Sequence, residues 1–304
     1  MARRDSVAPM RYDAHERLVA PARASAALPR LVGGIVLLVP LFLALSFGYA
    51  SLLPVIFGAE TWARMSPGIS AATTPAGVLI NLLTFAFLIV ALDVTLRVVH
   101  RRGLATLIGP MPLAVRQFGR ALAAMLLLYA VVMLIPMPEP VTPLPNLDAG
   151  TWMLFLLPAL FALFCQVFAE ELIFRGYLQS QLAARFSSPL IWLVLPSAAF
   201  ALLHFDAMSY GGTAWIVVLW AGAFGLAAAD LTARFGTLGP ATALHFINNF
   251  SAILIAAPEG QFDGMALYAY PFAMDDTAMI LTMMPVDLMV LFCGWLAIRL
   301  ALRG

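Results

Sequence analysis

Three short polar motifs interrupt the apolar stretches of the chain, and each contains side chains capable of acid–base chemistry. The first has two neighbouring carboxylates, Glu170 and Glu171, followed by Arg175. Neighbouring residues on a helix point about 100° apart, so the two carboxylates face different surroundings and cannot have the same role. Glu171 and Arg175 have the i, i+4 spacing of a helical ion pair. We therefore expect this pair to leave Glu170 free to face a cavity as a general base. A charge cluster at the end of a membrane span is the alternative.

The other two motifs place histidines in apolar surroundings. Phe200 lies one helical turn before His204 and could wall a pocket on the same face. His245 and Asn249 also share one helical face, and both can donate hydrogen bonds to one oxygen, as an oxyanion site requires. One alternative is that His204 is a packed, hydrogen-bonded residue. The other is that the third motif makes an interhelical clasp, a role that suits Asn248 better than Asn249.

The composition indicates what kind of protein must position these motifs. Hydrophobic residues make up 62% of the 304 residues and charged residues only 11%, against about 25% charged residues in a soluble domain. Lipid cannot satisfy an open backbone, so the apolar runs must be helices. We predict an all-α, polytopic membrane protein with about eight transmembrane helices. The expected spans are 31–54, 76–98, 120–137, 152–174, 189–208, 213–233, 240–257 and 279–300.

The distribution of arginine predicts the orientation of the chain. All 17 basic residues are Arg, and they gather in the N-terminal tail, in alternate loops and at the C-terminus, with Arg64 as the exception. By the positive-inside rule, both termini are cytoplasmic, and the chain is a multi-pass protein of the cell (inner) membrane. We expect residues 1–30 to be a cytoplasmic tail, either a surface amphipathic helix or disordered. Residues 31–304 are expected to form one membrane-embedded domain.

The depth of the motifs imposes a condition on the fourth helix. The fourth and fifth helices run in opposite directions, so Glu170 and His204 would lie at different depths if the fourth helix ended near Arg175. The two become level if the fourth helix continues to about Gln181–Ala184, before a break at 187–189. We therefore predict a long fourth helix with Glu170 inside the membrane.

Together, the three motifs resemble the CPBP family of CAAX proteases and bacteriocin-processing or immunity proteins, also called the Abi family. The family pattern is E-E-x-x-x-R, then F-x-x-x-H, then H-x-x-x-N on successive membrane helices. The chain has all three in that order, within a core at about 150–255. The eight-span layout with both ends inside also resembles that of the type II CAAX prenyl endopeptidase.

The resemblance implies an endopeptidase that hydrolyses a peptide bond of a membrane-associated or lipidated peptide. It implies a water activated by Glu170 and His204 and an oxyanion held by His245 and Asn249. The second carboxylate and the arginine of the first motif would support them. The candidate catalytic residues are therefore Glu170, Glu171, His204, His245 and Asn249, with Arg175, Phe200 and Asn248 in supporting positions.

No cofactor is expected, because the resemblance favours a glutamate-based, metal-free mechanism and the chain has no His-Glu-x-x-His motif. The alternative is zinc or another divalent metal ion held by Glu170, His204 and His245. The expected partners are a peptide or lipidated protein substrate and membrane lipids, with no nucleic acid. The sequence leaves open the oligomeric state and whether the substrate is prenylated.

Two other functions compete with proteolysis. One is a non-catalytic membrane protein, such as a bacteriocin self-immunity factor, that binds peptides in the same pocket. The other is a transporter or proton relay with Asp93, Asp230 and Asp287 among its coupling groups. Transporters often have duplicated halves, and the sequence shows no such symmetry. Asp93 also has the spacing to pair with Arg97 one turn later.

Overall fold

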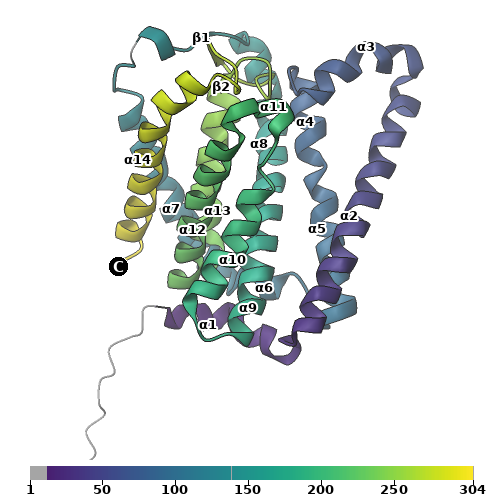
Figure 1. Cartoon of the computed structure of the whole chain (residues 1–304), viewed down its shortest axis with the longest axis vertical. Helices are drawn as coiled ribbons and strands as arrows, with labels where there is room; N and C mark the ends of the chain where they lie inside the picture. Colours follow the sequence, from purple (N-terminus) through teal and green to yellow (C-terminus); the bar gives the residue numbers. More distant parts are fainter. Residues whose placement is uncertain (1–11, 138, 304) are drawn as a thin grey trace, which may run out of the picture.

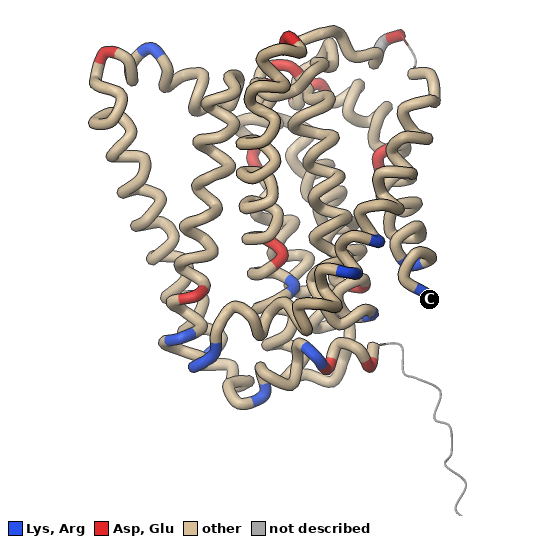
Figure 2. The backbone as a smooth tube through the Cα atoms, turned by 180° about the vertical axis from the view of Figure 1, so that it is seen from behind, with Lys and Arg blue, Asp and Glu red and all other residues tan. Residues whose placement is uncertain are grey.

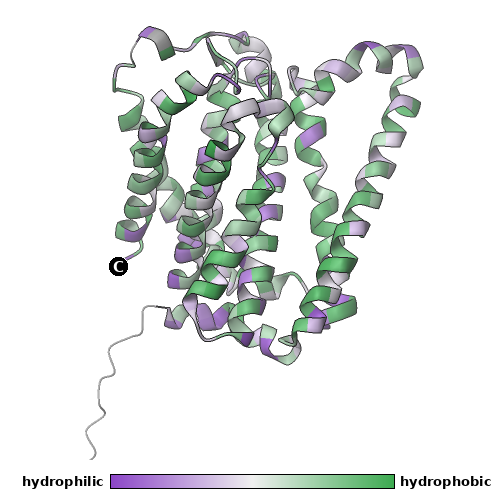
Figure 3. Cartoon of the chain, viewed as in Figure 1, coloured by the Kyte–Doolittle hydropathy of each residue, from purple (hydrophilic) through white to green (hydrophobic). Residues whose placement is uncertain are grey.

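The fold is a bundle of long helices, as Figure 1 shows for the computed structural model, which describes residues 12–137 and 139–303. Hydrophobic residues cover the middle of the bundle, and hydrophilic residues are more frequent toward its two ends (Figure 3). The chain is therefore an all-α, multi-pass membrane protein. In its described part, 6 helical stretches are long and apolar enough to cross a membrane: Leu28–Phe57, Pro75–His100, Met111–Val132, Ala149–Arg185, Ala207–Phe235 and Thr277–Ala301.

Several of these stretches combine consecutive helical segments. The first half of the chain contains α2 (Leu28–Phe57), α3 (Ala59–Ser70), α4 (Pro75–Leu83), α5 (Phe85–Thr95), the π-helical η3 (Leu96–His100), α6 (Ala105–Ile108), α7 (Met111–Val132) and a 3-10 turn, η4 (Glu139–Val141). The second half contains α8 (Ala149–Glu171), the π-helical η5 (Leu172–Gln179), α9 (Ser180–Arg185), α10 (Pro189–Leu202), α11 (Ala207–Tyr210), η6 (Gly211–Thr213), α12 (Ala214–Phe235), α13 (Gly239–Phe250), the π-helical η7 (Ser251–Ile255) and α14 (Thr277–Ala301).

Each of the eight predicted spans contains a helix, but two of these helices are shorter than a membrane crossing usually requires. α10 ends at Leu202 rather than at 208, because the Asp206 side chain accepts backbone N–H groups and begins α11. α13 has 12 residues before it continues as η7. The third span begins at Met111 rather than at 120. Its first turn contains a proline, which is favourable there because the first N–H groups of a helix have no partner within the helix.

The fourth helix is long enough to bring Glu170 and His204 to a similar depth, as the sequence analysis predicted. α8 continues through η5 and α9 to Arg185, a stretch of 37 residues. The helix widens into a π-helix immediately after Glu171, a local change that is frequent at functional sites. Phe186 then adopts an extended backbone and ends the helix. The predicted continuation to Gln181–Ala184 is therefore confirmed.

Small residues bring the helices that carry the three motifs close together. α13 lies against α7, α8 and α12, while α10 lies against α12 and η5. A Cβ on Gly239 would come 2.2 Å from the backbone oxygen of Ala114, so only glycine allows this approach of α13 to α7. A Cβ on Gly225 would come 3.0 Å from the Cβ of Ser197, where α12 meets α10. Such contacts are typical of helix packing in membranes.

The N-terminal segment lies across one end of the bundle (Figure 1). Its described part consists of three short turns, η1 (Asp13–His15), α1 (Glu16–Val19) and η2 (Ala20–Ser25). Leu18 and Ala22 are completely buried, so this part of the predicted tail is packed against the helices. The rest of that prediction falls on residues 1–11, which lie outside the described residues.

The two ends of the bundle differ in charge. Figure 2 shows basic residues gathered at the end where the N-terminal segment lies, and acidic residues more frequent at the opposite end. That opposite end also carries a small sheet with the strand order β1-β3-β2. Its strands are β1 (Leu144–Pro145), β2 (Ala256–Pro258) and β3 (Tyr268–Tyr270). β3 pairs antiparallel with β1 and parallel with β2.

Candidate active site

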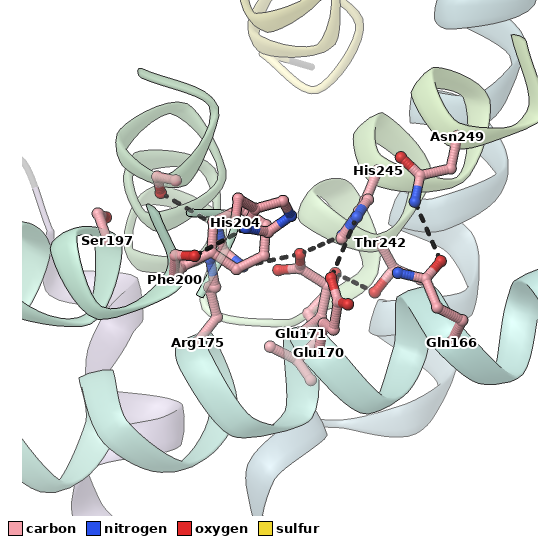
Figure 4. Close-up of polar contacts among 12 residues, drawn as sticks. Gln166, Glu170, Glu171, Arg175, Ser197, Phe200, His204, Thr242, His245 and Asn249 are labelled. Atoms are coloured by element: carbon pink, nitrogen blue, oxygen red, sulfur yellow. Dashed lines mark hydrogen bonds and ion pairs between the residues drawn. The ribbon is translucent and has the colours of Figure 1, made fainter. Parts of the chain in front are cut away.

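Helices α8 and α13 place two pairs of polar side chains opposite each other. Gln166 and Glu170 lie one turn apart on α8, facing Asn249 and His245 on α13 (Figure 4). The Asn249 amide donates to Gln166 Oε1 at 3.0 Å. His245 Nε2 lies 3.5 Å from Glu170 Oε2. The residue numbers of the contact partners rise along α8 and fall along α13, so the two helices run antiparallel. The two polar contacts follow each other along the interface, one helical turn apart.

Glu171 connects Arg175 to His245 through a single oxygen. Its Oε1 accepts a hydrogen bond from Arg175 Nη1 at 3.0 Å and another from His245 Nδ1 at 2.8 Å. Glu171 and Arg175 are both completely buried, and Arg175 Nη2 also donates to the Gly225 carbonyl oxygen at 3.4 Å. The predicted pairing of Glu171 with Arg175 is confirmed. Because the Nδ1 proton of His245 is held by Glu171, the other ring nitrogen, Nε2, is turned toward Glu170.

The ionisable groups at the centre of this cluster are buried together. Glu170, Glu171, Arg175 and His245 are each at most 8% exposed, and an uncompensated charge in such a place is costly. Arg175 pairs with Glu171, whereas Glu170 Oε2 lies 3.5 Å from His245 Nε2. Glu170 Oε2 is buried and has no hydrogen-bond partner among the described residues.

His204 lies in the turn after α10 rather than inside a helix. Its Nδ1 is 2.8 Å from the Phe200 carbonyl oxygen, which can only accept, so Nδ1 carries a proton, and in the neutral ring Nε2 is the nitrogen with the lone pair. The centroid of the buried Phe200 ring lies 4.5 Å from that of His204 and 6.0 Å from that of His245. The Arg175 guanidinium lies 4.6 Å over the same ring. Phe200 therefore contacts both imidazoles, and Figure 4 shows His204 and Asn249 on opposite sides of the glutamate pair.

The Asn249 carboxamide is held from two sides. Its Nδ2 donates to Gln166, and its Oδ1 accepts a hydrogen bond from Asn248 Nδ2 at 3.1 Å. Its second N–H makes no hydrogen bond to a described residue, so it can donate toward the site. Asn248 thus bonds to its neighbour, and no hydrogen bond joins its side chain to another helix among residues 12–137 and 139–303. The sequence-based site lacks Gln166, whose signal is an amide in an apolar run, one turn before Glu170.

The three unassigned aspartates have other partners. Asp93 pairs with Arg97 at 2.7 Å, as its spacing predicts. Asp287 lies on α14 with two tyrosines near it. Asp230 accepts hydrogen bonds from three side chains on different elements, those of Tyr12, Arg234 and Trp295. In the described part of the chain, none of these aspartates bonds to the glutamate–histidine cluster.

The positions of Glu170, His204 and His245 can be compared with the requirements of a metal site. Within residues 12–137 and 139–303, no three His, Cys, Asp or Glu side chains form a group that could hold a metal ion. The alternative ligand set of Glu170, His204 and His245 is therefore not assembled as a three-ligand site. His245 also uses Nδ1 for Glu171, and its Nε2 faces a carboxylate.

A multi-pass bundle that buries carboxylate, imidazole and carboxamide groups together has the groups that a membrane-embedded hydrolase needs. Residues 151–251, a stretch that contains all three polar motifs, match the family described as type II CAAX prenyl endopeptidase Rce1-like. This match assigns residues 151–251 to the CAAX protease family and supports an intramembrane protease in general terms. The match covers one third of the chain. No curated protein and no solved structure matches the chain.

Proposed function

We propose that the chain is a glutamate-dependent endopeptidase whose attacking water is activated by Glu170 and His204. His245 and Asn249 stabilise the oxyanion of the tetrahedral intermediate. The observation that carries this proposal is the 3.5 Å contact between Glu170 Oε2 and His245 Nε2 in a buried site. It supports the proposal because amide hydrolysis needs a general base and an oxyanion donor close to one carbonyl, the roles proposed for these two residues.

The proposed reaction couples proton transfer to the addition of water. In the proposed reactive state, His245 carries a proton on Nε2 and Glu170 is a carboxylate, which takes a proton from water as the water oxygen bonds to the carbonyl carbon. The carbonyl oxygen becomes an oxyanion, which accepts hydrogen bonds from His245 Nε2 and from the remaining N–H of Asn249. The C–N bond then breaks, and Glu170 gives the proton to the departing amine. His204 Nε2 orients the water by accepting a hydrogen bond from it.

Glu171 and Arg175 act through His245 in this scheme. The Glu171 carboxylate fixes the ring of His245, whose Nε2 donates to the oxyanion in this scheme while Nδ1 donates to Glu171. Arg175 in turn orients Glu171 through its hydrogen bond. Both are therefore positioning residues, because neither has to touch the substrate.

The proposed layout has eight membrane crossings and two cytoplasmic termini. The 6 long stretches supply six crossings, and α10 and α13 with η7 supply the two short ones. The gathering of basic residues at one end supports this orientation, since the positive-inside rule assigns that end to the cytoplasm (Figure 2). In this layout, the cluster around Glu170 lies within the cell (inner) membrane.

The proposed substrate is a peptide segment of a membrane-associated or lipidated protein. The description of the matching family, a prenyl endopeptidase, supports a lipidated substrate. We also propose that no metal participates, since Glu170 can accept the proton of the water without a Lewis acid. Activity that survives chelation, and is not increased by added zinc, is the expected result for this part of the proposal.

Proteomics of membrane fractions tests the proposal and needs no identified substrate. Cells that express the wild-type chain are compared with cells that express Glu170→Gln, which keeps the shape of the side chain but removes the base. The control is Glu60→Gln, because the Glu60 side chain is 89% exposed and lies on α3. Shortened membrane proteins should be present with the wild type and the control and absent with Glu170→Gln. His204→Ala should give the same loss.

Unchanged cleavage by Glu170→Gln would refute the proposal. A cellular phenotype that persists in Glu170→Gln, with no shortened protein in any strain, would instead favour the non-catalytic function of peptide binding or self-immunity. In a purified assay on an identified substrate, we expect a loss of about 10²–10⁴-fold in kcat, the usual contribution of a general base.

A further inference from the structure

A second buried polar cluster is centred on His100, at the end of η3. Its ring nitrogens lie 2.9 Å from Ser25 Oγ and 2.9 Å from Tyr177 OH, and Gln181 Nε2 lies 2.8 Å from Nδ1. A Cβ on Gly34 of α2 would come 2.0 Å from Tyr177 OH, so α2 can approach this cluster only because that position is glycine. His100 therefore has three neutral partners and no carboxylate, and the proposed reaction uses none of these groups.

Arg102 lies beside this cluster with an incompletely satisfied guanidinium. Its Nε and Nη2 atoms are buried and have no hydrogen-bond partner among the described residues. Its Nη1 makes only a long contact, 3.4 Å, with Thr106 Oγ1. Burial lowers the pKa of Arg102 to about 10, and the guanidinium faces Tyr177. A cation held in this way destabilises the protein unless an anion compensates its charge.

Arg30 is a second cation near His100, and neither Arg30 nor Arg102 has a carboxylate partner in the part of the chain that the structure describes. Arg30 is exposed, whereas Arg175 and Arg234, which are partly or fully buried, each pair with a carboxylate one turn earlier. Arg30 lies in the first turn of α2 and Arg102 follows η3 by two residues, and α2 packs against η3. Both cations act on His100, so together they form a basic site at this end of the two helices.

We infer that Arg102 and Arg30 form a binding site for a phosphate-type anion between α2 and η3. The planar guanidinium fork matches the geometry of a phosphate, and basic sites between helices at the cytoplasmic end of a bundle are suited to phosphate headgroups. The anion compensates the charge that the protein itself leaves unpaired. Two sources supply this chemistry, the headgroup of an anionic phospholipid and a free phosphate.

Thermal unfolding of the full chain in a non-ionic detergent tests this site and distinguishes the two sources. The probes are phosphatidylglycerol, with phosphatidylcholine as the neutral lipid control, and inorganic phosphate, with chloride at equal ionic strength as the salt control. A saturating anion should raise the unfolding temperature of the wild type by about 3 °C or more. A shift with phosphatidylglycerol alone assigns the site to a lipid headgroup, and a shift with inorganic phosphate assigns it to a free phosphate.

Variants then locate the effect. Arg102→Gln and Arg30→Gln should lose the shift, whereas Arg101→Gln should keep it, because Arg101 is an exposed neighbour with the same charge. In the absence of any anion, Arg102→Gln should unfold at the same temperature as the wild type or higher, since it removes an uncompensated buried cation. No shift with either probe, or an equal shift in Arg102→Gln, would overturn the inference. Protease activity does not enter the measurement, so this result is independent of the proposed reaction.

Discussion

His245 Nδ1 donates a hydrogen bond of 2.8 Å to Glu171 Oε1, the same oxygen that Arg175 Nη1 reaches at 3.0 Å. A charged pair on the fourth helix thus fixes the imidazole of another helix 74 residues later in the chain. Because all three side chains are buried, removal of any one leaves a charge or a donor without its partner.

The first prediction concerns the buried pair of Glu171 and Arg175. Arg175→Met should destabilise the protein by about 3–5 kcal/mol, because it leaves the Glu171 carboxylate buried and unpaired. The double variant Arg175→Met with Glu171→Leu should be more stable than Arg175→Met alone, since it removes the orphaned charge as well. Reversible unfolding in mixed micelles measures both. A double variant as unstable as the sum of the two single variants would show that the groups are not coupled.

The second prediction concerns Gln166, which holds the carboxamide of Asn249. Gln166→Leu removes the acceptor, so Asn249 loses its orientation, and we expect a fall of about tenfold or more in kcat with little change in KM. Gln166→Glu keeps an oxygen that accepts the same hydrogen bond and should recover part of the rate. Equal activity of Gln166→Leu and the wild type would remove Gln166 from the set of positioning residues.

The third prediction concerns the pH dependence of stability through His15. This residue is buried in the N-terminal segment against Trp192, with a centroid separation of 4.8 Å, and desolvation lowers its pKa from 6.5 to about 4. The folded state therefore binds the proton less readily than the unfolded state. The contribution to stability is complete above pH 6.5 and is lost as the pH falls through about 4, by up to about 3 kcal/mol. Unfolding midpoints measured between pH 7 and pH 4 report this loss, and His15→Phe should flatten the curve.

The fourth prediction compares two adjacent glycines of α2. A Cβ on Gly34 would lie 2.0 Å from Tyr177 OH and 3.0 Å from His100 Nε2, whereas a Cβ on Gly33 meets nothing within 4 Å. Gly34→Ala should therefore cost about 1–3 kcal/mol, since α2 or the His100 cluster must move. Gly33→Ala should be neutral or slightly stabilising, because alanine favours a helix. Similar unfolding temperatures for the two variants would contradict this packing of α2.

The sequence by itself determined the class of protein, the approximate positions of its apolar helices and the pairs that lie one turn apart. Charged residues are too few, and apolar runs too long, for any other class. The spacing of Glu171 and Arg175 was sufficient to predict their ion pair because the period of a helix is fixed by local geometry. The long fourth helix was predicted because Glu170 and His204 can form one site only if they lie at the same depth in the membrane.

Only the tertiary structure decided which residues meet across helices. The contact of Gln166 with Asn249 joins residues 83 positions apart, and it depends on how α8 and α13 are rotated about their axes. That rotation results from close approaches at small residues such as Gly239 and Gly225, whose neighbours are remote in sequence. Hydrophobic periodicity does not encode these neighbours in helices that are apolar on almost every side.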